Sequence, residues 1–506
     1  MAQGQVAIES EPAGPRFGIL IQVGLLAAPF MSMIDGSIVN VALPDIASSM
    51  HATLAAVQWV ASAYLLTLGM ALSATAFLAK RFGTSRVYRL SLIGFSVASA
   101  LCAVSPGVAA LVAARMLQGL FGAALVPLAM NMLLGDGEAR KRMSWYAGML
   151  LFLAPAIGPT LGGVLIRWAG WPAIFLVNVP LGLIAVFGVL RLPPAFSRAQ
   201  AGTRFDSAGF ALLAAGLALV TYGASQGPQA GWLSSSAWPF WLPGALLLAA
   251  YGVFGARSRH PILDLKPLRR PQAALALGLT VIAAVVSWVV IILVPAFMQE
   301  IQGRSAWIAG LTLLPQGLVV GIGTLLGDRW LPRLGLRTTV TLGTLILTAS
   351  TLGLLAVTLS SPAWLIAVIL TGRGVSTGLV IQPLLTELIG RLPSEEVPDG
   401  NTLFNVANRV GGSFGIALVV TFFELRERLR VKQALVQLGI PTRLAETLGG
   451  PHPAATMPPA VARALANAAT VGFHDVVWMV AAIGAAGILA SAMLKGGNAS
   501  AQATGD

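Results

Sequence analysis

The sequence predicts an all-α polytopic membrane protein, and three observations support this fold class. The chain of 506 residues is 56% hydrophobic and only 10% charged, whereas soluble proteins carry about 25% charged residues. The charges lie in short clusters between long apolar segments. The single cysteine, Cys102, excludes an intrachain disulfide framework and a cysteine-based metal cage. This composition excludes a large soluble enzyme, a disordered scaffold and, despite the net charge of +13, a nucleic-acid-binding protein.

Fourteen segments are long and apolar enough to cross a membrane. A spanning helix needs about 20 mostly apolar residues to cross about 30 Å of hydrocarbon. The fourteen segments lie at about 17–43, 54–77, 87–104, 108–133, 143–166, 171–191, 208–225, 237–256, 273–299, 306–327, 338–358, 363–388, 402–424 and 474–494. Nothing before residue 17 has the pattern of a cleaved signal peptide, so we expect the first span to remain as an anchor.

Basic residues alternate between successive connections of these spans. The connections after even-numbered spans hold nineteen Lys and Arg residues, whereas the other short connections hold only Arg167 and Arg304. Because short loops rich in Lys and Arg stay in the cytoplasm, this pattern predicts that both termini are cytoplasmic and that the protein lies in the inner or plasma membrane. The connection 425–473 is predicted to be a long extracytoplasmic loop, containing either an amphipathic surface helix or a solvated lid.

A weak internal repeat relates the two ends of the chain. In the fourth span, Arg115 is followed by glycines and a proline, and the twelfth span repeats this order from Arg373. Transporters are commonly built from such repeats, with the substrate site near the midplane where they meet. The repeat predicts a six-helix half at 1–191, a linker with two extra spans at 192–272 and a second six-helix half at 273–506.

Two ionisable residues at similar depth are the first candidates for function. Asp35 lies eight residues from the outer end of the first span, about 12 Å deep, and Arg115 lies about 10 Å deep in the fourth span. Ionisable groups at membrane depth are costly and indicate function. We therefore expect Asp35 and Arg115 to pair and to control proton binding. The alternative is a permanent salt bridge that only joins two helices.

Two further arginines are expected to have structural roles. Arg373 has no evident acid at its depth, and Arg409 could extend to the cytoplasmic surface or bind Glu387. The fifth span has a different signal, a run of small residues and prolines with the residues Pro155, Gly158, Pro159, Gly162 and Gly163. Small residues allow close helix packing and prolines bend helices. This run predicts a helix that packs against a partner in one state and separates in another; ordinary tight packing is the alternative.

Several of these motifs together resemble a known family. The segment 34–44, which includes Asp35 and Asn40, is similar to the first-span signature of the fourteen-helix drug:proton antiporters of the major facilitator superfamily, the EmrB/QacA type. The fourth span resembles the Arg-centred proton-coupling motif of that superfamily, and the fifth span resembles its antiporter motif. The segments 175–182 and 411–415 fit the same family, so the resemblance covers nearly the whole chain.

One connection departs from the family pattern. Between the second and third spans the family usually has a Gly and then an Asp before an Arg. Here Ala76 and Lys80 occupy these positions, while Arg81 and Gly83 are kept. The Asp normally helps to latch the two halves on the cytoplasmic side. The resemblance therefore implies a cytoplasmic gate loop at Lys80, Arg81 and Gly83. In this loop the contact that holds the two halves together is weaker or is formed differently.

The resemblance implies export of hydrophobic, often cationic compounds powered by the proton gradient. Asp35 would exchange a proton for substrate, Arg115 would respond to that proton, and Asn40 would lie near the cavity. The implied partners are a small-molecule substrate, protons and the lipid bilayer, with no metal or organic cofactor; a periplasmic adaptor is left open. Two alternatives remain, an exporter of one dedicated metabolite such as a siderophore, peptide or sugar, and a membrane-embedded enzyme. Against the enzyme, the chain has no HExxH or GxxxxGK[ST] motif.

Overall fold

The computed structural model describes most of the chain as helices. The described residues are 19–52, 54–133, 154, 157–158, 161–190, 192, 205–258, 261–390, 392–393, 396–437 and 459–495. The helices are α1 Ile19–Ser49, α2 Leu54–Phe82, α3 Thr84–Ala103, α4 Val108–Gly122, α5 Leu125–Leu133, α7 Ala173–Leu176, α8 Asn178–Val189, α9 Ser207–Ala230, α10 Trp238–Arg257, α11 Pro271–Ala296, α12 Ala306–Gly353, α13 Ala363–Gly390, α14 Val397–Gln437 and α16 Pro459–Ser491. Residues 161–169 are also helical, and no described residue lies in a strand. The prediction of an all-helical membrane protein is confirmed.

The structure gives 11 helices that are long and apolar enough to cross a membrane, fewer than the fourteen predicted. Two predicted spans, 306–327 and 338–358, are two helical segments on either side of a kink at Gly335 and are counted together as α12. The predicted span 171–191 forms the short helices α7 and α8, separated by Val177, and its apolar part, Ala173–Val189, counts as a shorter helix. The predicted span 143–166 lies mostly outside the described residues. These three differences account for the lower number.

The merger within α12 has a local cause at Gly335. This residue has φ 77° and ψ 166° inside an otherwise helical run, so the chain bends there without forming a loop. Residues with a Cβ are strongly disfavoured at such angles. The Thr339 hydroxyl donates a hydrogen bond to the Gly335 carbonyl (2.9 Å) and satisfies a backbone group at the kink. Gly335 therefore replaces the predicted connection with a sharp bend.

The described ends of the predicted loop 425–473 belong to two helices. α14 continues to Gln437 and α16 begins at Pro459, so both ends of the predicted loop are helical. They are extensions of two spans rather than a separate surface helix. Asp475 on α16 pairs with Arg430 (3.1 Å) and Arg426 (3.7 Å) on α14, which holds the two extensions together. Residues 438–458 lie outside the described part of the chain.

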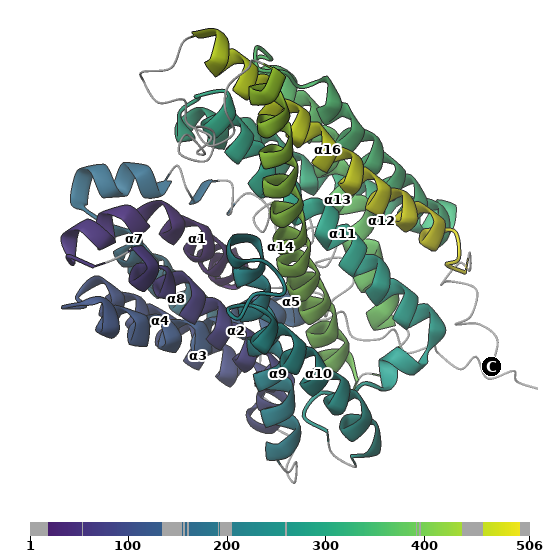
Figure 1. The fold of residues 1–506 in the computed structure, drawn as a ribbon. Coiled ribbons are helices and arrows are strands. Elements are labelled where there is room, and N and C mark those ends of the chain that lie inside the picture. The colour runs from purple at the N-terminus through teal and green to yellow at the C-terminus, as the bar shows by residue number, and fades with distance from the viewer. Residues whose placement is uncertain are drawn as a thin grey trace, which may run out of the picture.

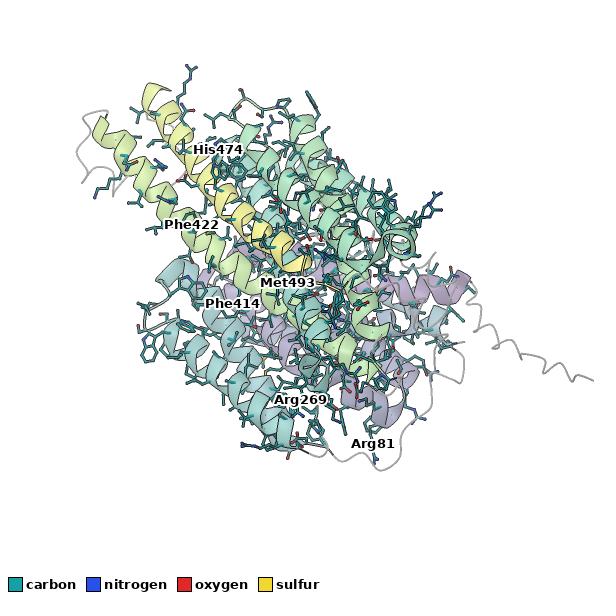
Figure 2. All side chains as sticks on the ribbon, turned by 90° about the vertical axis from the view of Figure 1, so that its right-hand side faces the viewer. Arg81, Arg269, Phe414, Phe422, His474 and Met493 are labelled. Carbon is teal, nitrogen blue, oxygen red and sulfur yellow. The ribbon has the colours of Figure 1, made fainter. Side chains whose placement is uncertain are left out.

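The helices form two groups with α14 running between them (Figure 1). α1 to α8 make the first group, and α11, α12, α13 and α16 pack with α14 in the second. In Figure 2, Arg81 and Arg269 lie at one end of the molecule, which we call the basic end, whereas Phe422 and His474 lie toward the opposite end. The basic end is the end at which α1 begins and α2 finishes.

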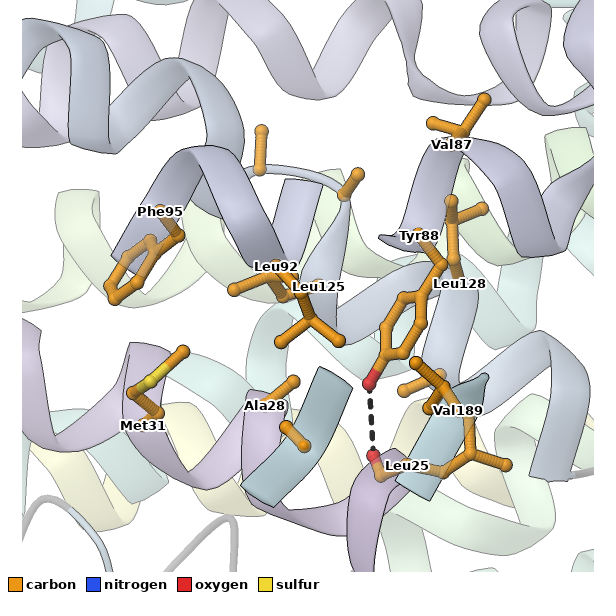
Figure 3. Packing of buried hydrophobic residues seen from close by; sticks show 14 of the residues in the cluster. Leu25, Ala28, Met31, Val87, Tyr88, Leu92, Phe95, Leu125, Leu128 and Val189 are labelled. Carbon is orange, nitrogen blue, oxygen red and sulfur yellow. Dashed lines mark hydrogen bonds between the residues drawn. The ribbon is translucent and has the colours of Figure 1, made fainter. Parts of the chain in front are cut away.

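The two groups share apolar cores only at the basic end. The core of the first group contains Leu25, Tyr88 and Leu128, and Val406 of α14 packs against it. Val406 also packs against the neighbouring core of the second group, in which Ala74 of α2 is buried. Figure 3 shows the Tyr88 hydroxyl directed at the Leu25 carbonyl, to which it donates a hydrogen bond (3.3 Å).

At the opposite end, the described residues form two separate cores. One contains Ile34, Val60 and Phe175 and belongs to the first group alone. The other contains Val290, Leu370 and other residues of the second group alone. The molecule is therefore closed between the groups at the basic end, where apolar side chains of both groups are packed together.

The inserted helices α9 and α10 bridge the groups near the opposite end. Tyr222 of α9 stacks on Trp59 of α2, with ring centroids 5.3 Å apart. Trp232, in the connection between α9 and α10, stacks on Phe414 of α14 (6.4 Å) and donates a hydrogen bond to Thr421 (2.9 Å). The inserted pair thus contacts both groups where their own cores are separate.

The kink in α12 generates a stability prediction. Replacing Gly335 by Ala should lower the free energy of unfolding by about 1–3 kcal/mol, because a Cβ at this φ and ψ is strained. The matched control is Gly278→Ala in α11, where a Cβ meets no atom within 4 Å and Ala favours the helix. Thermal unfolding of both purified variants in detergent checks this. A Gly335→Ala protein as stable as Gly278→Ala would contradict the prediction.

Candidate functional site

An ion pair between Asp35 and Arg115 lies inside the first group of helices. Asp35, in the second half of α1, is 0% exposed, and Arg115, at the middle of α4, is 1% exposed. The Arg115 Nη1 atom donates to Asp35 Oδ2 at 2.5 Å. The two residues that were predicted at similar depth therefore form a buried salt bridge.

Two amides complete the coordination of the Asp35 carboxylate. Asp35 Oδ1 accepts hydrogen bonds from Gln118 Nε2 (3.0 Å) and Asn178 Nδ2 (2.9 Å). Gln118 also accepts from Arg115 Nη1 (2.6 Å) and donates to Ser99 Oγ (2.6 Å). Helices α1, α3, α4 and α8 thus meet at one polar cluster. Such a carboxylate has the hydrogen-bond partners of its charged form, which is the condition for burying a charge in hydrocarbon.

The other side of Arg115 is covered by α2. Its Nε donates to the carbonyl of Val60 (3.0 Å), and its guanidinium carbon lies 4.1 Å from the centroid of the Tyr64 ring. The Phe175 ring lies at 5.7 Å. Tyr64 in turn contacts Ser32 of α1, with 3.3 Å between the two hydroxyl oxygens. Val60, Tyr64 and Phe175 therefore cover the Arg115 side of the ion pair.

Glycines allow the helices to approach this closely. A Cβ at Gly119 would clash with the Tyr64 carbonyl and the Thr67 hydroxyl, so Gly119 sets the contact of α4 with α2. Gly182 of α8 has the same role against Ser96 of α3. Small residues at such positions are typical of tightly packed membrane helices. Gly119 therefore determines how closely α4, which carries Arg115, approaches α2.

The small-residue run of the fifth predicted span contacts α1 next to Asp35. A Cβ at Gly158 would clash with Ser37, and one at Gly162 would lie 2.8 Å from Ile38 Cγ1 and 3.2 Å from its carbonyl oxygen. At Gly163 a Cβ would meet no atom within 4 Å. Pro155 and Pro159 lie outside the described residues. Two of the three described glycines thus form a close contact one turn from the ion pair.

Lys80 of the predicted gate loop bridges the two groups of helices. Its Nζ forms an ion pair with Asp399 at the start of α14, 319 positions away, and the Asp399 side chain is only 3% exposed. Asp399 also accepts a long hydrogen bond from the amide of Asp264 (3.5 Å) in the linker before α11. Arg81 is exposed, and Gly83 has φ 86° where α2 turns into α3. The connection therefore carries a cross-group ion pair at the basic end.

Arg373 and Arg409 form no contact with Asp35 among the described residues. Arg373 is 0% exposed and donates to Thr351 Oγ1 (2.5 Å) and the Val286 carbonyl (2.6 Å), but its Nε has no partner and no described carboxylate pairs with it. Arg409 is partly exposed, and no ion pair joins it to Glu387 among the described residues. Asn40 lies in α1, and its side chain is outside the described part.

Sequence reasoning missed four residues of this region. Gln118 lies three positions after Arg115 and hence on the same helix face, a signal that could have identified it. Asn178 lies in the segment 175–182, which resembles the family, but no role was predicted for it. Tyr64 and Asp399 carried no signal, because their contacts depend on how distant helices pack.

Sequence similarity to known proteins identifies the family of this chain. The sequence matches the family model of the Major Facilitator Superfamily over residues 25–416. This match covers well over half of the chain. The chain belongs to the major facilitator superfamily.

Proteins named for drug resistance are among the relatives of this major facilitator protein. It is 30% identical over 441 residues to the multidrug resistance protein B homolog of Mycobacterium tuberculosis (strain H37Rv), covering 83% of this chain and 81% of that protein. It is 30% identical over 416 residues to the methylenomycin A resistance protein of Bacillus subtilis (81% and 88%). It is 27% identical over 424 residues to the multidrug export protein EmrB of Escherichia coli (82% and 82%).

These findings confirm the family and the general activity. The superfamily consists of transporters, and the relatives bear names of transport and resistance proteins, so the chain is a multi-pass membrane transporter and not an enzyme. The resemblance to the drug antiporter family, which rested on the motifs around Asp35, Arg115 and Gly158, agrees with both comparisons.

The contact of Gly162 with α1 generates a second prediction. In this transporter, Gly162→Ala should destabilise the fold by about 1–3 kcal/mol, because the new Cβ overpacks against the Ile38 side chain and carbonyl. Gly163→Ala, its neighbour, should be neutral or slightly stabilising, since the site is open. Thermal midpoints in detergent measure both, and equal midpoints would show that the contact with α1 is absent.

Proposed function

We propose that this transporter exports hydrophobic drugs or other toxic compounds in exchange for protons, by alternating access, across the inner or plasma membrane with both termini in the cytoplasm. The single observation that carries the proposal is the buried ion pair of Asp35 and Arg115 (2.5 Å), which holds a titratable carboxylate at membrane depth. Relatives named as multidrug resistance and export proteins support the substrate class. The protons and the cargo are the only reactants, and no cofactor takes part.

The proton would act by breaking the ion pair. A proton added to Asp35 Oδ2 neutralises the carboxylate, and Arg115 then keeps its charge without a counter-charge. Removing one partner of a buried pair costs about 3–5 kcal/mol, so the protonated state favours a rearrangement in which Arg115 finds other partners. Because helices α1, α2, α3, α4 and α8 all contact this cluster, the rearrangement can change how they pack. Proton binding and helix movement are coupled in this way.

Alternating access requires that the basic end opens and closes. Here both groups share apolar cores at the basic end, and Lys80 pairs with Asp399 across them. With the basic end in the cytoplasm, this is a conformation closed toward the cytoplasm. Lys80 stands where the related family usually has Asp, and the ion pair with Asp399 supports a latch of reversed polarity. The close contact of Gly158 and Gly162 with α1 would be remade as the molecule changes state.

Export of one dedicated compound is the second candidate function. Two relatives carry names that refer to single compounds: the methylenomycin A resistance protein of Bacillus subtilis and the tetracenomycin C resistance and export protein of Streptomyces glaucescens, which is 28% identical over 404 residues (79% of this chain, 74% of that protein). Accumulation of a panel of chemically unrelated compounds in cells that express the transporter separates the two functions.

The third prediction concerns Asp35 and proton coupling. In vesicles reconstituted with the transporter, an imposed pH gradient should raise cargo flux about tenfold or more, and Asp35→Asn should lose this gradient-dependent part. Asn cannot change its charge, so the proton has no site. Exchange of labelled for unlabelled cargo without a gradient should persist, which shows that the variant is folded.

The matched control for this variant is Asp45→Asn. Asp45 lies on the same helix but is exposed, so its removal should leave the gradient dependence unchanged. Flux through Asp35→Asn that still follows the pH gradient like the parent protein would refute the role of Asp35.

The fourth prediction concerns the Lys80–Asp399 latch. Lys80→Asp and Asp399→Lys should each lower gradient-driven flux several-fold, because each places like charges opposite one another at the basic end. The double variant restores an ion pair and should recover most of the flux. Arg81→Asp, next to Lys80 but exposed, is the control. A double variant no better than the single ones would show that the pair does not hold the gate.

A further inference from the structure

The charges at the seam between the two groups do not match a cationic cargo. Asp35 is 0% exposed, and its oxygens are occupied by Arg115, Gln118 and Asn178. Both oxygens of Asp35 are therefore engaged by protein groups and are not directed at the boundary between the two groups of helices. Arg409, in contrast, is partly exposed at membrane depth, and it makes no hydrogen bond or ion pair with any residue that the structure describes. The accessible charge here is positive.

Arg409 belongs to the face of α14 that meets the first group. Val406, three positions earlier and hence on the same side, packs against the cores of both groups. A different face of α14 packs against α11, where a Cβ at Gly411 or Gly415 would touch Val281 or Val285. Arg409 thus lies on the side of α14 that faces the boundary between the two groups.

The residue beside Arg409 adds further donors and an aromatic surface. Asn408 Oδ1 accepts a hydrogen bond from the Trp288 indole (3.2 Å), which fixes the amide with its NH₂ group unpaired among the described residues. Trp288 is partly exposed and lies against Gly412, one turn along α14. Asn408 therefore places an amide donor beside the Trp288 indole, and Arg409 follows Asn408 in the same helix.

We propose that Arg409 and Asn408 bind the anionic group of an aromatic cargo, such as a carboxylate, sulfonate or phenolate, while the ring system packs on Trp288. This inference rests on the proposed export function and specifies its cargo. A guanidinium within a membrane span is stabilised by an anion, and its planar set of donors binds carboxylate and sulfonate oxygens in a bidentate manner. Arg409, rather than Asp35, would then contact the charged part of the cargo.

The sign of the cargo charge determines which force drives the transporter. If one proton enters for each monovalent cation that leaves, no net charge moves. If one proton enters for each anion that leaves, both steps move positive charge inward, so the membrane potential adds to the pH gradient. Anion export should therefore respond to an imposed membrane potential even when no pH gradient is present.

The experiment compares two probes with one ring system and opposite charges. They are 1-pyrenesulfonate and (1-pyrenylmethyl)trimethylammonium, tested with the parent protein, Arg409→Gln, Arg409→Lys and the control Arg426→Gln, which lies on the same helix but at the exposed end. Binding to the full-length protein in detergent is measured by fluorescence anisotropy, and flux in reconstituted vesicles is measured with a pH gradient and, separately, with a membrane potential.

The parent and Arg426→Gln should bind the sulfonate at least tenfold more tightly than the ammonium probe. Arg409→Gln should lose this preference, whereas Arg409→Lys should keep part of it, and sulfonate flux should follow the membrane potential. Unchanged sulfonate binding by Arg409→Gln, or an equal loss for both probes, would overturn the assignment of Arg409. Gradient-driven flux of the ammonium probe alone would reject the anionic cargo but retain proton-coupled export. Sulfonate binding without gradient-driven flux of either probe would reject proton-coupled export but retain the anion site.

Discussion

The burial of Asp35 against Arg115 is the constraint on which the first group of helices depends. Either charge alone is costly at membrane depth, and the pair is stabilised by hydrogen-bonding groups of the surrounding helices. α1 contributes the carboxylate, α4 the guanidinium and Gln118, α8 the amide of Asn178, and α2 the carbonyl of Val60. Glycines such as Gly119 then follow as a requirement, because these groups meet only if the helix backbones approach closely.

The same constraint links the ion pair to the closure of the basic end. α2 carries Val60 and Tyr64 against Arg115 in its first half and Lys80 against Asp399 at its last turn. Under the proposed mechanism, a change in the packing of α2 at the ion pair would be transmitted along this helix to the cross-group contact. α14 has Asp399 at its first turn and Val406, which packs against the cores of both groups, farther along. Among these helices, α2 contacts both the ion pair and Asp399 directly.

The extent to which the sequence predicts this structure depends on the kind of contact. The similar depth of Asp35 and Arg115 follows from helical rise alone, and their ion pair could be predicted from it. Spans were recognisable from length and hydropathy, but a kink at Gly335 and a break at Val177 depend on local backbone angles and packing. The pairing of Lys80 with Asp399 joins residues 319 positions apart. No periodicity or motif encodes that pair, because it depends on how the two groups of helices pack.

The internal repeat places an arginine in each group, yet their environments differ. Arg115 has a carboxylate, whereas Arg373 is bound only by the Thr351 hydroxyl and the Val286 carbonyl among the described residues. An arginine without a titratable partner cannot report on protons, since its own charge is permanent over the physiological range. Under the proposed mechanism, the proton therefore acts in the first group alone, while the second group contributes cations, Arg373 in its interior and Arg409 at the seam. This asymmetry separates the two tasks of an exchanger, because proton and cargo then bind to different groups of helices, which are linked by the contacts at the basic end and by α9 and the connection that follows it.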